Sequence, residues 1–61
     1  MNAIGSIRKS LKVTQEQLAS QVGITQSYLS MLERDERRID LELAAKIAQT
    51  LGCKVDDLLK K

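Results

Sequence analysis

The side chains best suited to recognise another molecule gather in the middle of the sequence, within residues 26–31. Gln26 carries an amide, which offers a donor and an acceptor side by side and can pair with N6 and N7 of adenine. The hydroxyls of Ser27 and Ser30 can reach base edges or phosphates, and Met31 can contact a thymine methyl group. These four residues are therefore candidates for reading the edges of base pairs.

Covalent and metal chemistry have little support in this composition. The sequence contains no histidine, and Cys53 is its only cysteine, so neither a Cys/His nucleophilic pair nor a Cys/His metal site can form. There is no glycine-rich phosphate loop, and the carboxylates are scattered along the chain. We expect no enzyme, no cofactor and no metal, and we interpret Cys53 as a small buried filler.

Positive charge is concentrated in the first half of the chain, although the net charge is only +2. Residues 1–32 carry three cations against Glu16, whereas residues 33–61 carry seven basic and seven acidic groups. The cations that could contact phosphates are Lys9, Lys12, Arg34, Arg37 and Arg38. Each of them could equally be a solvated surface cation.

Helices must position these side chains, because the chain lacks proline and has one aromatic residue, which leaves strands poorly supported. Ile4, Ile7 and Leu11 recur at the spacing of a first amphipathic helix whose polar side is cationic. The segment from Met1 to Leu11 has no apolar run of the signal-peptide kind, and no stretch approaches the roughly 18 apolar residues of a membrane helix. We expect a cytoplasmic protein that does not enter a membrane.

The segment QEQLASQVGITQSYLSMLER, residues 15–34, predicts two short helices with a corner between them. Thr14 and Gln17 form a capping box before the first helix, and Thr25 caps the second. Gly23 can adopt positive φ and close the turn.

The apolar residues of this segment predict how its two helices meet. Ala19 is small enough to let the second helix approach the first. The remaining contacts would come from Leu18, Val22, Ile24, Leu29 and Leu32. This is the geometry of a helix-turn-helix, in which the second helix enters the major groove of DNA.

The second half of the chain predicts a charged loop and two further helices. Residues 34–38 lack apolar periodicity and indicate a solvated loop. Asp40 and Gly52 would cap and stop a fourth helix, with an apolar face of Leu41, Ala44, Ile47, Ala48 and Leu51. A short final helix is indicated by the spacing of Val55, Leu58 and Leu59. The sequence thus predicts a single all-α domain of five helices over residues 1–61.

From about Ile4 to Leu59 the chain resembles the lambda-repressor-like (XRE-type) family of phage repressors, Cro proteins and related bacterial regulators. The resemblance is carried by TQEQLASQVGITQSYLSMLE and LELAAKIAQTLGCKVDDLL, which stand at the family's separation. It implies a sequence-specific regulator of transcription that binds duplex DNA in the bacterial cytoplasm or in a phage-infected host.

The resemblance also assigns roles to individual residues. Gln15 and Gln26 match two glutamines of the family, the first of which bonds a phosphate and braces the second. Thr25 is a further candidate for phosphate contact. Tyr28 could either bond a phosphate or pack as an aromatic plate over the first helix of the motif.

Arg8 and Glu33 match a pair that forms a largely buried ion pair in this family, so we expect a structural role for both. The chain departs from the family pattern in its loops, where Lys12 and Asp35 replace glycine and Ile39 replaces proline. Asp35 and its neighbour Glu36 also add negative charge near the expected line of phosphates.

A domain of this size buries too little surface to select one site in a genome, so we expect a homodimer on a palindromic operator. The family's dimer surface corresponds here to Cys53, Lys54, Val55, Leu58 and Leu59. Leu58 or Leu59 could equally belong to the core of one chain. The alternative function is a protein-binding module, such as an antitoxin partner or a coactivator, which the near-neutral second half and the acidic loop would favour.

Overall fold

The computed structural model describes residues 2–59, and every regular element within that range is a helix. The ends of the expected domain, Met1, Lys60 and Lys61, lie outside the described residues. The helices are α1 (Ile4–Ser10), α2 (Gln15–Val22), α3 (Gln26–Glu33), α4 (Leu41–Leu51) and α5 (Val55–Leu58). The five-helix prediction is therefore confirmed.

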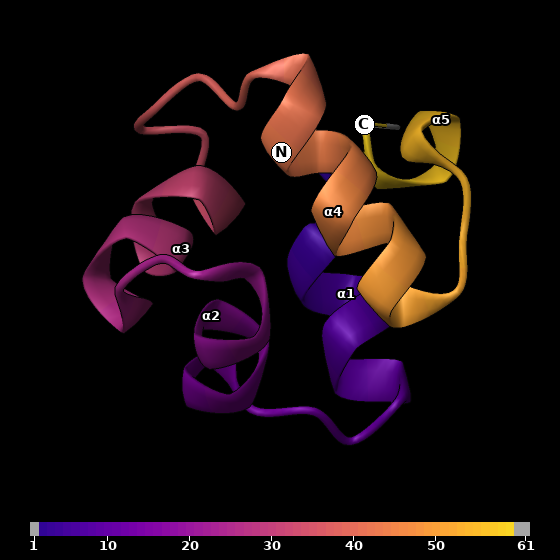
Figure 1. Ribbon diagram of the computed structural model, residues 1–61, viewed down its shortest axis with the longest axis horizontal. Coiled ribbons are helices and arrows are strands. Elements are labelled where there is room, and N and C mark those ends of the chain that lie inside the picture. The colour runs from indigo at the N-terminus through magenta and orange to yellow at the C-terminus, as the bar shows by residue number, and fades with distance from the viewer. Residues whose placement is uncertain (1, 60–61) are drawn as a thin grey trace.

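The five helices are grouped around a common interior (Figure 1). Helix α2 packs against both α3 and α4, and α4 packs against α5. The backbone N–H of Ala3 donates to the carbonyl of Leu58 at 2.8 Å, which joins the two ends of the described chain. No described helix is long and apolar enough to cross a membrane.

Local capping sets the start of three helices, as the sequence predicts. The Thr14 hydroxyl accepts from the Gln17 backbone N–H at 3.0 Å, and the Gln17 side chain accepts from Thr14 N–H at 2.9 Å. Thr25 accepts from the backbone N–H of Tyr28 at 3.0 Å, and Asp40 from that of Leu43 at 2.7 Å. Each cap contributes about 1 kcal/mol by satisfying a free amide of the first turn.

Left-handed residues follow four of the helices. Gly23 and Gly52 have φ of +80° and +73°, which glycine adopts without a steric cost. Lys12 and Asp35 both have φ of +59°, although they carry side chains. The chain therefore keeps the turn geometry at the two loops where it lacks the family's glycine.

The core lies where α1, α2, α3, α4 and α5 converge. It consists of Ile4, Leu18, Ala19, Val22, Leu29, Leu32, Ala44, Ile47, Ala48, Leu51 and Leu58, all of which are buried. Ile7, Val13, Ile24, Ile39, Leu43, Cys53 and Val55 pack partly buried against it. Cys53 is thus half-buried rather than fully buried as expected, and its burial, with the nearby charge of Asp57, raises the pKa of the thiol.

Three leucines of the expected helices are exposed. For Leu11 and Leu41 this differs from the predicted apolar helix faces, whereas for Leu59 the sequence left both a core position and a dimer surface open. Leu11 is 50% exposed because α1 ends at Ser10 and the chain turns away there. Leu41 is 73% exposed because it is the first residue of α4 and lies beyond the edge of the core. Leu59 is 44% exposed, since it follows the last turn of α5.

Candidate nucleic-acid interface

The outer side of α3 and the start of α2 form an open depression. It is lined by Gln15, Gln26, Ser27, Ser30, Met31, Arg34 and Glu36. The buried side chains of Leu29 and Leu32 define the inner side of α3. The side chains that line the depression lie on the other sides of the helix. The structure thus brings together the four residues predicted to read bases and places Gln15 beside them.

A second depression adjoins the first and extends it toward α1. It is lined by Asn2, Gly5, Ser6, Arg8, Lys9, Gln15, Ser30, Glu33 and Arg34. Gln15, Ser30 and Arg34 belong to both depressions, which are therefore continuous. We refer to the residues that line the two depressions as the α3 face.

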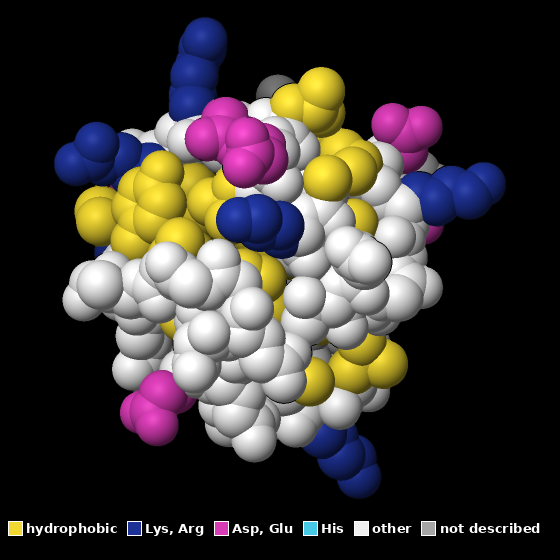
Figure 2. Space-filling view, in the orientation of Figure 1, with side chains coloured by type: hydrophobic (Ala, Val, Ile, Leu, Met, Phe, Trp, Pro, Cys, Tyr) yellow, Lys and Arg dark blue, Asp and Glu magenta, His cyan; other side chains and the backbone are white. Residues whose placement is uncertain are grey.

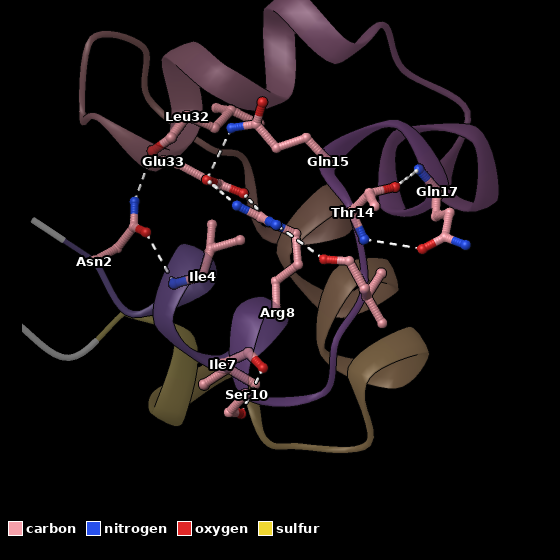
Figure 3. Close-up of polar contacts among 11 residues, drawn as sticks. Asn2, Ile4, Ile7, Arg8, Ser10, Thr14, Gln15, Gln17, Leu32 and Glu33 are labelled. Atoms are coloured by element: carbon pink, nitrogen blue, oxygen red, sulfur yellow. Dashed lines mark hydrogen bonds and ion pairs between the residues drawn. The ribbon is translucent and has the colours of Figure 1, made fainter.

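An ion pair between α1 and α3 lies beneath this face (Figure 3). Arg8 Nε donates to Glu33 Oε2 at 2.7 Å, and Arg8 Nη2 donates to Glu33 Oε1 at 3.1 Å. The third guanidinium nitrogen, Nη1, donates to the carbonyl of Val13 at 2.9 Å. The side chains of Arg8 and Glu33 are only 8% and 10% exposed, so Arg8 has a structural role in joining α1 to α3.

Glu33 also holds Gln15, whose Nε2 donates to Glu33 Oε1 at 3.0 Å. Sequence reasoning expected Gln15 to brace Gln26. In the described part of the chain the Gln15 side chain donates to Glu33, because a carboxylate is a stronger acceptor than an amide. The bracing of Gln26 by Gln15 stays a prediction. Gln15 still lines the same depression as Gln26.

The ionisation of Glu33 is set by two opposing effects. Burial alone raises its pKa, but the hydrogen bonds from Arg8 and Gln15 lower it, and so do the charges of Arg8 and Lys9. The lowering effects win, so the pKa of Glu33 lies below its ordinary value of 4.5. The carboxylate stays ionised under neutral conditions and keeps α1, α2 and α3 joined.

The candidate phosphate contacts occupy different parts of the molecule. Lys9 and Arg34 line the α3 face. Lys12, Arg37 and Arg38 are exposed in the turns that follow α1 and α3. On the side shown in Figure 2, Lys and Arg side chains project singly rather than forming one continuous basic patch.

Thr25 and Tyr28 lie at the start of α3 but differ in their surroundings. The Thr25 hydroxyl is used as the helix cap. Tyr28 is half-buried and lines a separate depression with Val22, Ile24, Asp40, Glu42, Leu43 and Lys46. Tyr28 therefore stands between the α2–α3 turn and α4, on a different flank of α3 from Gln26.

Sequence reasoning missed two residues that shape the α3 face. The Asn2 side chain accepts from Ile4 N–H at 3.0 Å and donates to Leu32 O at 2.7 Å, which ties the start of α1 to the end of α3. An asparagine just before an apolar helix is a capping signal that could have revealed the bond to Ile4, but not the one to Leu32. At Gly5, an added Cβ would lie 3.0 Å from Glu33 Oε1, so the glycine makes room for the carboxylate.

A second ion pair, between Arg34 and Glu36, was also missed. Arg34 Nε and Nη2 donate to the two carboxylate oxygens of Glu36 at 2.8 and 3.1 Å. Both side chains are more than half exposed, at 57% and 53%. The pair lies at the rim of the α3 face, where both residues line the first depression.

The expected dimer surface is corrected at one residue. Leu58 is 0% exposed and packs in the core of its own chain, so its side chain is not available to a partner. Cys53 and Val55 are partly buried against the core, whereas Lys54 and Leu59 are exposed.

Residues 4–58 match the family model described as helix-turn-helix. The chain is 34% identical over 55 residues to an uncharacterized helix-turn-helix-type transcriptional regulator from Archaeoglobus fulgidus, covering 90% of this chain and 78% of the relative. It is 38% identical over 56 residues to the immunity repressor protein of Bacillus phage phi105, covering 92% of this chain but only 39% of the repressor.

Solved structures show the same arrangement of helices. The clp gene regulator ClgR from Corynebacterium glutamicum superposes with a TM-score of 0.88 at 36% identity, covering 92% of this chain and 60% of that one. The P22 c2 repressor protein in complex with a synthetic operator superposes with a TM-score of 0.85 at 35% identity, covering 93% of this chain and 86% of that one.

Proposed function

The chain belongs to the lambda-repressor-like helix-turn-helix family of transcriptional regulators, a non-enzymatic DNA-binding family, and on that premise we propose that its α3 face binds a specific duplex sequence as an operator. This chain spans well under two thirds of the phage repressor and 60% of ClgR. The proposal therefore concerns residues 1–61 as one DNA-binding unit. Its place of action would be the cytoplasm of a bacterium or of a phage-infected host.

The observation that carries this proposal is the depression that collects Gln26, Ser27, Ser30 and Met31 on the outer side of α3. Their chemistry fits the major groove, where adenine presents a donor and an acceptor and thymine presents a methyl group. We assign base contacts to these four residues. Phosphate contacts would come from the surrounding residues Gln15, Thr25, Lys9, Lys12, Arg34, Arg37 and Arg38, while the surroundings of Tyr28 favour packing.

The operator would be a palindrome bound by two copies of the chain. One α3 face is too small to select a single genomic site, and two copies would place their α3 helices in major grooves about 34 Å apart. Leu59, whose apolar side chain is exposed directly after α5, supports a contact there, and the expected surface also includes Cys53, Lys54 and Val55 at the start of the same helix.

Selection of bound duplexes from a random library tests this function. The expected result is an enriched palindrome whose half-sites are separated by one helical turn, about 10 base pairs. An enriched asymmetric half-site would refute the dimer while keeping the DNA-binding role. Capture of one stoichiometric protein partner, with no enriched DNA, would favour the protein-binding alternative instead.

A further inference from the structure

We propose that Glu36 is a specificity-determining residue, which restrains the DNA affinity of the α3 face by holding Arg34 in an ion pair. The inference rests on the proposed DNA-binding function and concerns how that face distinguishes an operator from other DNA. It assigns a role to a carboxylate that lies where the phosphates of DNA would approach.

The end of α3 creates this ion pair through its backbone geometry. The N–H of Glu36 donates back to the carbonyl of Met31 at 2.9 Å, and that of Asp35 donates to Leu32 O at 3.2 Å. Asp35 takes the left-handed conformation that this motif requires. The tight reversal sets the side chains of Arg34 and Glu36 next to each other, and the guanidinium grips both carboxylate oxygens.

Arg34 is placed to be one of the main cations of the α3 face. The cations that line its two depressions are Arg8, Lys9 and Arg34. Arg8 is buried and bound to Glu33, so Lys9 and Arg34 remain for contacts with DNA. Arg34 therefore supplies a large share of the positive charge on the α3 face, and pairing with Glu36 makes that charge less available to phosphates.

The pair is weak enough to open when DNA binds. Both side chains are more than half exposed, and exposed ion pairs contribute little net stability. A phosphate that approaches Arg34 must nevertheless replace the carboxylate, which then stays nearby as a repelling charge. Glu36 thus imposes a competition that every phosphate contact of Arg34 must overcome.

This competition weakens non-specific binding more than operator binding. Non-specific affinity comes almost entirely from phosphate contacts, whereas an operator is also held by base contacts. Base contacts by Gln26 and its neighbours would fix a phosphate beside Arg34 and favour the exchange. On other DNA the phosphates are not held in register, so the Arg34–Glu36 pair stays closed.

The test compares Glu36→Gln with the wild type on a labelled duplex of random sequence and on the duplex recovered by selection, over a series of salt concentrations. Glu36→Gln should bind the random duplex about three- to ten-fold more tightly at 0.1 M salt, with a salt slope steeper by about 0.9, as one more phosphate contact requires. Affinity for the selected duplex should rise less. The matched control Glu42→Gln removes the same charge from α4, beside Tyr28, and should change affinity by less than about two-fold.

The double variant Arg34→Ala/Glu36→Gln shows whether the effect runs through Arg34. Its affinity should lie within about two-fold of that of Arg34→Ala, because no guanidinium remains to be released and only the screened repulsion between Glu36 and the phosphates is removed. An equal gain from Glu36→Gln in the presence and absence of Arg34 would overturn the proposal, as would weaker binding by Glu36→Gln or an equal gain on both duplexes. Failure of the wild type to bind either duplex would refute the proposed function itself, together with this inference.

Discussion

At the scale of single residues, the shape of the α3 face depends on Glu33. Its two oxygens accept two hydrogen bonds from Arg8 and one from Gln15, so one carboxylate links α1, α2 and α3. Because both side chains are largely buried, removing either partner leaves a buried charge without its oppositely charged partner. The positions of Gln15 and of the end of α3 therefore depend on Arg8 and Glu33, which lie outside the proposed DNA contacts.

Arg8→Met should destabilise the fold by about 3–5 kcal/mol, because it leaves Glu33 charged and buried. Unfolding in urea measures this loss. The paired replacement Arg8→Met/Glu33→Leu removes both charges and should recover most of the stability, while the exposed control Arg37→Met should have little effect. Equal losses in the single and the paired variant would contradict a buried, mutually dependent pair.

The lowered pKa of Glu33 predicts a loss of stability in acid. The folded state binds a proton at Glu33 less readily than the unfolded chain, whose pKa is near 4.5. The stabilisation is complete above this value and is lost as the pH falls through the lower pKa of the folded state. Urea unfolding between pH 7 and pH 3 should show a steeper loss in the wild type than in Arg8→Met/Glu33→Leu, and parallel curves would refute the assignment.

At the scale of elements, what the sequence predicted well is governed by local interactions. The caps at Thr14, Thr25 and Asp40 and the stops at Gly23 and Gly52 each involve residues within one turn, so their signals are contained in short segments. Exposure at helix ends depends on how far the neighbouring helices reach, which periodicity does not encode. Leu11 and Leu41 therefore fit the helix periodicity, but the structure places their side chains outside the core.

Lys12→Gly should stabilise the fold by about 0.5–1 kcal/mol. Lys12 has a left-handed backbone, which costs a residue with a Cβ about 1–2 kcal/mol. Glycine avoids this strain but loses roughly 0.5–1 kcal/mol more conformational entropy on folding, so the net gain is smaller than the strain. The reverse control is Gly23→Ala, where an added Cβ meets nothing within 4 Å, so any loss reports backbone strain alone. Urea midpoints measure both variants, and a less stable Lys12→Gly would contradict this explanation.

At the scale of the whole molecule, the sequence could predict which residues line the depression on α3, but not which of the surrounding side chains bond to one another. Gln26, Ser27, Ser30 and Met31 share one depression because helix periodicity places them on the side of α3 opposite Leu29 and Leu32. The partner of Gln15 and the pairing of Arg34 depend on which elements meet in three dimensions. For the same reason, the burial of Leu58 could be decided only by the packing of α5 against α4.

The central claim is that the outer side of α3 reads DNA sequence. The most direct measurement is the affinity of Gln26→Ala for the selected duplex and for its single base-pair variants. The loss should be about 1–3 kcal/mol, with discrimination relaxed at one base pair and the salt slope unchanged. Gln21→Ala, an exposed glutamine on α2 that lines another depression, serves as the matched control and should bind like the wild type. Wild-type affinity and wild-type base preference in Gln26→Ala would contradict the claim.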